Sequence, residues 1–244
     1  MRLDKKLLEL GLASTRSKAQ RLIERNAVKV NGLVATKPSM EITDNDKIDV
    51  QQDAVKYVSL GGEKLEAADT RLNIMFNDCR VLDAGASTGG FTDYALQNGA
   101  KLVYAVDVGH GLLDVKLKSD ARVKSLEEKD VRDLTIADID DKPVDLIVSD
   151  LSFMSLYKVL PDYRRLLKPT GRLVGLVNPQ FEHVEKTAGA TKYESPAYDY
   201  NDVVKKVKQI LALNGFDFAN ACRADESASS TNIEVFVSAV KRAT

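Results

Sequence analysis

The stretch that decides the fold is residues 81–92, which read Val81-Leu82-Asp83-Ala84-Gly85-Ala86-Ser87-Thr88-Gly89-Gly90-Phe91-Thr92. A short apolar run leads into a glycine-rich turn, and a mixed apolar and polar segment follows it. This pattern predicts a buried strand, a tight turn and then a helix. Glycines in such a turn let the backbone approach a ligand where a side chain would clash, and the unpaired N–H groups at the start of the helix favour a polar or anionic ligand.

From Arg80 onward, short apolar strands alternate with amphipathic helices, which predicts an α/β fold with a mostly parallel sheet and helices on both faces. The strands are expected at residues 81–84, 102–106, 123–126, 146–149 and 173–177, and the helices at 91–97, 156–167 and 202–213. Two late strands, 216–221 and 233–240, have no long helix between them, so we expect an antiparallel pair there.

Acidic residues stand at the ends of three successive predicted strands: Asp83, Asp107 and Asp130. The glycine spacing differs from the G-x-G-x-x-G of dinucleotide loops, where an acid at the position of Asp83 would face a pyrophosphate. A cationic ligand such as S-adenosylmethionine suits these acids, with Asp107 on the ribose hydroxyls and Asp130 on the adenine amino group. Each acid taken alone is equally consistent with a helix N-cap. The cofactor-binding residues we predict are Asp83, Gly85, Ser87, Thr88, Gly89, Gly90, Phe91, Asp107, Val108 and Asp130.

The first fifty residues form a separate pattern of two helices and a short hairpin sheet. Leucines at helical spacing run to Gly11, a second helix is expected over 15–24 with Ser14 as its N-cap, and Asn31-Gly32 marks a hairpin turn. This segment carries a net charge of +3, which leaves −4 for the remainder because the whole chain carries −1. A basic unit on an acidic body suits RNA binding. We predict domains at 1–50 and 58–244, joined by a linker at 51–57.

The length of 244 residues and the 44% hydrophobic content allow two domains with real cores. The two cysteines and two histidines support neither a disulfide framework nor a metal site. No apolar stretch approaches the roughly 18–20 residues needed to cross a bilayer. We therefore expect a soluble cytoplasmic protein with no membrane and no metal partner. Residues 57–62 are expected to form a turn, with a helix starting at Glu63.

The motifs resemble a known family. Residues 1 to about 50, with Gly11-Leu12-Ala13 and Val28-Lys29-Val30-Asn31-Gly32, resemble the S4 RNA-binding domain, and residues 57 onward, with the loop at 85–92, resemble the FtsJ-like ribose methyltransferases. The combination, together with Pro179-Gln180-Phe181-Glu182, is similar to the TlyA family, whose members are described as ribosomal RNA 2′-O-methyltransferases acting on cytidine; many carry the older label haemolysin.

The resemblance implies a class I methyltransferase fold (Rossmann-like) with a small N-terminal α+β S4 domain. It also implies S-adenosylmethionine as cofactor and ribosomal RNA or ribosomal subunits as partners. The residues of the S4 domain implied to contact RNA are Arg2, Arg16, Lys18, Arg21 and Lys29.

FtsJ-like enzymes have a Lys-Asp-Lys-Glu catalytic set, and the resemblance assigns three of its members to Lys64, Asp150 and Glu234. The second lysine, usually the general base, is replaced by Asn178, whose amide cannot accept the proton. Three alternatives stay open. The chain is an active methyltransferase with another base, such as Lys64 or Lys186; it binds RNA and cofactor without turnover; or it methylates another target, such as a base nitrogen. We favour RNA 2′-O-methylation, and a membrane-active haemolysin is the alternative with the least support.

Overall fold

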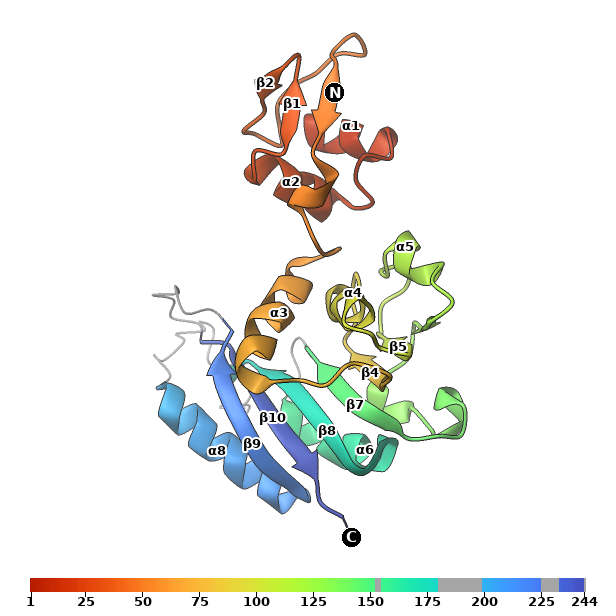
Figure 1. Ribbon diagram of the computed structural model, residues 1–244, viewed down its shortest axis with the longest axis vertical. Coiled ribbons are helices and arrows are strands. Elements are labelled where there is room, and N and C mark those ends of the chain that lie inside the picture. Colours follow the sequence, from red (N-terminus) through yellow and green to blue (C-terminus); the bar gives the residue numbers. More distant parts are fainter. Residues whose placement is uncertain (152–154, 180–198, 225–232, 244) are drawn as a thin grey trace, which may run out of the picture.

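The computed structural model describes residues 1–151, 155–179, 199–224 and 233–243. Its N-terminal unit has its own core, built around Leu7, Leu22 and Val28. The strands of this unit form an antiparallel sheet in the order β2-β1-β3. The elements of the unit are α1 (Leu3–Glu9), α2 (Arg16–Glu24), β1 (Val28–Val30), β2 (Leu33–Val34) and β3 (Ile48–Val50). Figure 1 shows the unit standing apart from the large sheet, to which the chain connects it through α3 (Leu60–Leu72).

The expected N-cap of α2 was wrong by one residue. Thr15, not Ser14, precedes the helix, and its hydroxyl accepts a hydrogen bond from the backbone N–H of Lys18. The hydroxyl of Ser14 instead donates to the carboxylate of Asp114 in the second domain. Ser14 therefore connects the two domains rather than capping a helix.

The start of α3 also differs from the expectation. The helix begins at Leu60, so Gly61 and Gly62 lie in its first turn instead of in a loop. The reason is close packing: a Cβ on Gly62 would lie 2.5 Å from Cγ of Tyr57. The glycines serve the approach of α3 to its neighbours, and a local pattern cannot distinguish this use of glycine from a turn. Between the two units, the predicted linker contains a short 3₁₀ turn, η1 (Gln52–Ala54).

The large domain is built on a seven-stranded sheet in the order β6-β5-β4-β7-β8-β10-β9. Its strands are β4 (Arg80–Ala84), β5 (Leu102–Val106), β6 (Val123–Leu126), β7 (Val144–Ser149), β8 (Leu167–Val177), β9 (Phe216–Arg223) and β10 (Val235–Lys241). The first five run parallel, and β10 pairs antiparallel with both β8 and β9. The predicted mostly parallel sheet with a late antiparallel pair is confirmed.

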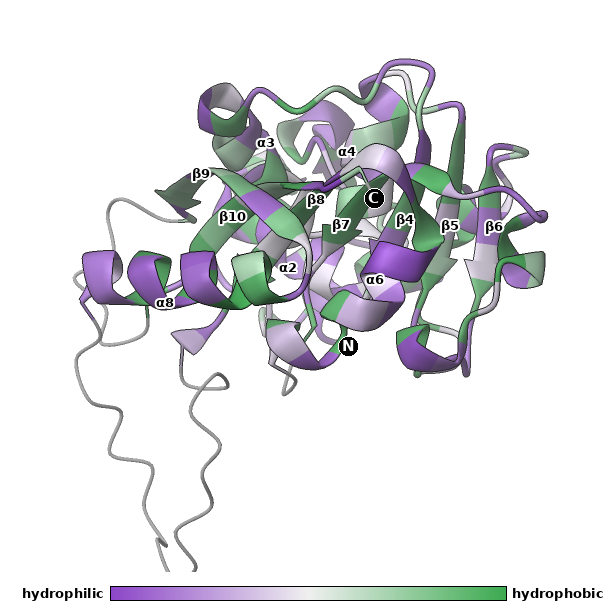
Figure 2. Cartoon of the chain, turned by 90° about the horizontal axis from the view of Figure 1, so that it is seen from below, coloured by the Kyte–Doolittle hydropathy of each residue, from purple (hydrophilic) through white to green (hydrophobic). Residues whose placement is uncertain are grey.

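Helices cover both faces of this sheet. Figure 2 shows α3 and α4 on one face and α6 and α8 on the other. Successive strand residues point to opposite faces of the sheet and so belong to two different cores. Val81 belongs to the core under α3 and α4, and Leu82 belongs to the core under α6 and α8. The helices and 3₁₀ turns of this domain that follow α3 are α4 (Gly90–Gln97), α5 (Val115–Lys118), η2 (Val131–Asp133), η3 (Ala137–Ile139), η4 (Leu156–Lys158), α6 (Leu160–Leu166) and α8 (Tyr200–Leu213).

The helix expected over 156–167 is two elements, η4 and α6. Pro161 stands in the first turn of α6, where a missing N–H costs nothing, so the proline starts the helix instead of continuing one. Strand β8 then begins at Leu167, earlier than expected. Within the residues that the structure describes, no helix is long and apolar enough to cross a membrane.

The packing of α3 yields a test with a matched control. Gly62→Ala should lower the free energy of unfolding by about 1–3 kcal/mol, because the new methyl group would press on the ring of Tyr57. Gly61→Ala should change it by only about 0–1 kcal/mol in the stabilising direction, since its Cβ would lie 3.5 Å from Phe91, an ordinary contact, in a helix that favours alanine. Urea denaturation followed by circular dichroism measures both. Equal effects of the two variants would contradict this account of the glycine pair.

Candidate functional site

The carboxyl ends of β4, β5 and β7 meet at one edge of the sheet, where they border a cavity of about 410 Å³. Parallel strands bring their carboxyl ends to the same edge, and in open α/β sheets this is where ligands bind. The cavity is lined by Gly85, Ser87, Val106, Asp107, Val108, Leu112, Lys129, Asp130, Val131, Asp150 and Leu151. Three of these side chains are acids, and the walls are otherwise largely apolar.

Gly85 sets the shape of the cavity floor. Its φ of +83° lies in the left-handed region, and a Cβ there would stand 2.3 Å from the carbonyl oxygen of Asp150. Both facts exclude a side chain at this position. The loop after β4 and the end of β7 are therefore held backbone against backbone, and the space above them stays open.

Asp107 organises the loop that borders the cavity. One carboxylate oxygen accepts from the backbone N–H of Ser87 and the other from that of Gly109, each at 2.8 Å. Asp130, farther along the same wall, accepts from the N–H of Arg132 at 2.9 Å and pairs with its guanidinium at 2.6 Å. The hydrogen bond from Arg132 holds the pKa of Asp130 below its usual range. Asp130 is thus present as a carboxylate at neutral pH, and both acids line the cavity.

Asp83 lies behind the cavity rather than on its wall. It is 1% exposed, and one oxygen accepts from the hydroxyl of Thr92 at 2.6 Å. The other oxygen, Oδ1, is buried and has no hydrogen-bond partner in the described part of the chain. Burial raises the pKa of this carboxyl to about 7.

The remaining predicted cofactor residues also divide into some that line the cavity and others that do not. Val108 lines the cavity, whereas Thr88, Gly89, Gly90 and Phe91 are not among its lining residues. Gly89 has a φ of +95° and lies against Leu117, and Phe91 packs on Phe236 with ring centroids 5.9 Å apart. These residues support the loop from behind. The sequence pattern did not identify Leu112, Lys129 and Leu151 as cavity residues, because they come from segments without a motif.

A second cluster adjoins the cavity and contains the predicted catalytic residues. The ammonium group of Lys64 on α3 donates to Glu234 at 2.6 Å. Asp150 follows β7, lines the cavity and interacts electrostatically with both Lys64 and Glu234. Burial raises the pKa of the Asp150 carboxyl. The structure therefore brings Lys64, Asp150 and Glu234 together from three elements.

Asn178 belongs to the same neighbourhood by strand register. Val177 is paired with Val235, so Asn178 and Glu234 are the next residues, just beyond the ends of the two antiparallel strands. Its side chain is partly buried. Asn178 thus stands at the position where the resemblance leads one to expect a lysine. Lys186, which was considered above as another base, falls outside the described residues, as does His183. His110 is an exposed loop residue with its side chain 77% accessible.

The predicted RNA-contacting residues do not all share one surface. Asp4 is fully buried and accepts from Arg2 at 2.9 Å and from Arg16 at 3.0 Å, and the Arg2 hydrogen bond holds the pKa of Asp4 well below its usual range. This carboxylate fixes two partly exposed guanidinium groups beside each other. Lys18 is partly buried, and Lys29 is exposed.

Arg21 is the exception among these residues. It is 5% exposed, donates to the carbonyl of Tyr57 at 3.1 Å and pairs with Glu63 at 2.5 Å. Arg25 pairs with the same carboxylate at 2.6 Å. Arg21 therefore joins the two domains and is not available to RNA in this arrangement. The sequence alone does not reveal this contact, because 42 residues separate its partners and no motif marks Glu63.

No group of three or more His, Cys, Asp or Glu side chains that could hold a metal ion occurs within residues 1–151, 155–179, 199–224 and 233–243.

The raised pKa of Asp83 predicts a pH dependence of stability in the absence of ligand. Between about pH 4 and 7 the folded protein holds this proton, whereas the unfolded chain, with an ordinary pKa of 3.8, has lost it. Stability should therefore fall as the pH rises through this window, by roughly 2–4 kcal/mol. Asp83→Asn should remove most of that fall and leave the part contributed by Asp150, whose pKa is also raised. Asp78→Asn, at an exposed turn before β4, should preserve the whole fall. The urea midpoint of each protein, measured at pH 4.5, 6 and 7.5, tests this prediction. If the midpoint of Asp83→Asn falls with pH as steeply as that of the native protein, the raised pKa does not belong to Asp83.

Comparison with known proteins places the chain in a family. Residues 57–241 match the model of the FtsJ-like methyltransferases, and residues 1–48 match that of the S4 domain. Hemolysin A of Brachyspira hyodysenteriae is 44% identical over 182 residues, 75% of each chain. The 16S/23S rRNA (cytidine-2′-O)-methyltransferase TlyA of Mycobacterium tuberculosis (strain H37Rv) is 43% identical over 182 residues, 74% of this chain and 68% of the relative.

A solved structure from Streptococcus thermophilus, named for a hemolysin, superposes with a TM-score of 0.73 at 34% identity and covers all of this chain and 89% of its own. The two family models together span both domains, and the solved structure matches the whole chain. The chain belongs to the TlyA family of FtsJ-like methyltransferases, with an S4 domain at its N-terminus.

Proposed function

We propose that this protein transfers a methyl group from S-adenosylmethionine to the 2′-hydroxyl of a cytidine in ribosomal RNA. The observation that carries the proposal is the position of Asp150, which lines the cavity at the carboxyl edge and also belongs to the cluster with Lys64 and Glu234. A cofactor site and a reactive site that share one residue are adjacent. The printed activity of the Mycobacterium tuberculosis relative supports the choice of substrate.

The cavity residues fit S-adenosylmethionine. This cofactor supplies an electrophilic methyl group on a positively charged sulfur. Asp107, which is already fixed by two backbone N–H groups, has lone pairs left for ribose hydroxyls, and Asp130 lies on the wall where an adenine amino group would need an acceptor. The open floor above Gly85 agrees with a ligand held close to the backbone.

The chemistry asks the protein to orient the ribose hydroxyl and to receive its proton. Lys64 is held by Glu234 at 2.6 Å, and an ammonium group offers only donors. We assign it the role of orienting the hydroxyl oxygen or an adjacent phosphate. Asp150 is the better acceptor, because burial raises the pKa of its carboxyl and so makes the carboxylate a stronger base than an exposed one. Asn178 would hold the hydroxyl by a hydrogen bond.

The S4 domain would make most of the contacts with RNA. Arg2 and Arg16, fixed by Asp4, present two guanidinium groups, and Lys18 and Lys29 add ammonium groups. Contacts of this kind recognise the shape of structured RNA and the positions of its phosphates, and depend little on its sequence. Arg21 is left out of the proposed surface, since it is occupied at the domain contact.

The decisive experiment is transfer of radiolabelled methyl from S-adenosylmethionine to ribosomal subunits that lack the modification, measured as single turnovers at saturating cofactor. The native protein should label ribose. Asp150→Asn should slow the methyl-transfer step by about 10²–10⁴-fold, because the proton acceptor is lost. Asp141→Asn is the matched control: this exposed aspartate precedes β7 at its other end, and its replacement should leave the rate unchanged.

Asn178→Lys, run beside these variants, separates activity from binding. Label with Asn178→Lys but none with the native protein would mean that the chain binds RNA and cofactor without turnover, and the proposed function would be wrong. Full activity in Asp150→Asn would leave the methyltransferase function intact and would refute the role of Asp150.

A further inference from the structure

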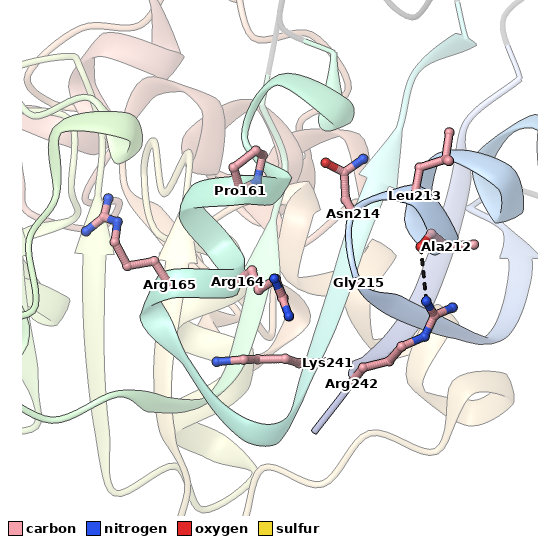
Figure 3. A pocket seen from close by; sticks show the side chains of 9 residues that line it. All are labelled: Pro161, Arg164, Arg165, Ala212, Leu213, Asn214, Gly215, Lys241 and Arg242. Carbon is pink, nitrogen blue, oxygen red and sulfur yellow. Dashed lines mark hydrogen bonds between the residues drawn. The ribbon is translucent and has the colours of Figure 1, made fainter. Parts of the chain in front are cut away.

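A second cavity, of about 680 Å³, lies at the opposite edge of the sheet from the cofactor cavity. Its walls come from α6, from the turn that joins α8 to β9, and from the end of β10, as Figure 3 shows. Strand β8 starts here and β10 ends here, so this is the amino edge of the parallel strands. The cavity is lined by Pro161, Arg164, Arg165, Ala212, Leu213, Asn214, Gly215, Lys241 and Arg242.

Two of the four basic residues in this cavity are occupied by other parts of the chain. Arg165 points away from the centre in Figure 3 and donates to the carbonyl of Leu134 at 2.6 Å. Arg242 pairs with Asp217 at 2.7 Å. Both cations therefore have partners within the protein.

Arg164 and Lys241 are not neutralised in this way. In Figure 3 their side chains extend toward each other from α6 and β10. Within the described residues, no Asp or Glu forms an ion pair with either. The Nε of Arg164 is buried and lacks a hydrogen-bond partner there. Lys241 donates to the carbonyl of Leu167 at 2.6 Å, and burial together with the charge of Arg164 lowers the pKa of its ammonium group.

Gly215 shows that the position of Arg164 depends on the backbone beside it. This residue has a φ of +78°, and a Cβ there would stand 2.8 Å from the Nε of Arg164. The end of the Arg164 side chain therefore lies close to a turn that has no room for a side chain of its own. Two like charges held together in a cavity repel each other, and a bound anion would relieve that repulsion.

We propose that this cavity binds a phosphate group between Arg164 and Lys241. A guanidinium offers paired donors to phosphate oxygens, and a lysine adds a point charge. The phosphate would come from the RNA backbone or from a small phosphorylated molecule. Pro161 and Leu213, the latter 87% exposed, form an apolar rim suited to the organic part attached to the phosphate. The site is separate from the cofactor cavity and does not depend on methyl transfer.

The test uses the full-length protein, with inorganic pyrophosphate and a structured fragment of ribosomal RNA as probes. Calorimetric titration should show saturable binding of one pyrophosphate per chain. Arg164→Gln and Lys241→Gln should each weaken it by about tenfold or more, as expected for loss of a charge-assisted contact. Lys205→Gln, the matched control, removes an exposed charge of α8 outside the cavity lining and should bind as the native protein does. Circular dichroism confirms that each variant is folded, and cofactor affinity should be unchanged in all.

Titration with the RNA fragment identifies the source of the phosphate. Weaker RNA binding in Arg164→Gln, with a salt slope reduced by about one and with competition by pyrophosphate, assigns the site to the RNA backbone. Unchanged RNA binding with weakened pyrophosphate binding assigns it to a small phosphorylated ligand. No saturable binding of pyrophosphate and no effect of Arg164→Gln on RNA overturns the proposal, as does pyrophosphate binding that survives both Gln variants.

Discussion

The backbones at Gly85 and Asp150 approach so closely that a single methyl group between them would stand 2.3 Å from a carbonyl oxygen. This contact ties the loop after β4 to the end of β7, the neighbouring strand in the sheet. The cavity floor, the position of the Asp150 carboxylate and the separation between that carboxylate and Asp107 all depend on it. A larger residue at position 85 would push the two strand ends apart and alter both sites at once.

Helix α3 contacts both the S4 domain and the cluster beside the cavity. Two consecutive residues face different partners: Glu63 pairs with Arg21 and Arg25 of the S4 domain, and Lys64 pairs with Glu234 beside the cavity. Ser14 and Asp114 add a second contact between the domains. Under the proposed function, an RNA bound by Arg2 and Arg16 would be positioned relative to Lys64 by this same helix. Side chains on one rigid helix keep their spacing better than side chains on separate loops.

Local patterns in the sequence predicted much of this architecture. Strands β5 and β6 have the expected bounds because apolar alternation and turn residues mark both ends. The start of α3 was mistaken because Gly61 and Gly62 look like a turn but serve close packing against Tyr57. Ser14 and Arg21 were assigned to a cap and to RNA, since a sequence does not show contacts between segments 100 or 42 residues apart. Asp83, which was predicted to bind the cofactor, lies behind the cavity with its side chain turned toward Thr92.

The central claim, that this edge of the sheet methylates ribose in ribosomal RNA, is tested most directly in the cell. Ribosomal RNA from cells with and without the gene would be digested to nucleosides and compared by mass spectrometry, with nuclease protection to locate any difference. The account predicts 2′-O-methylcytidine at a defined site only when the gene is present, and its return when the native gene is supplied. Identical 2′-O-methylcytidine content and position in the two RNA samples would contradict it.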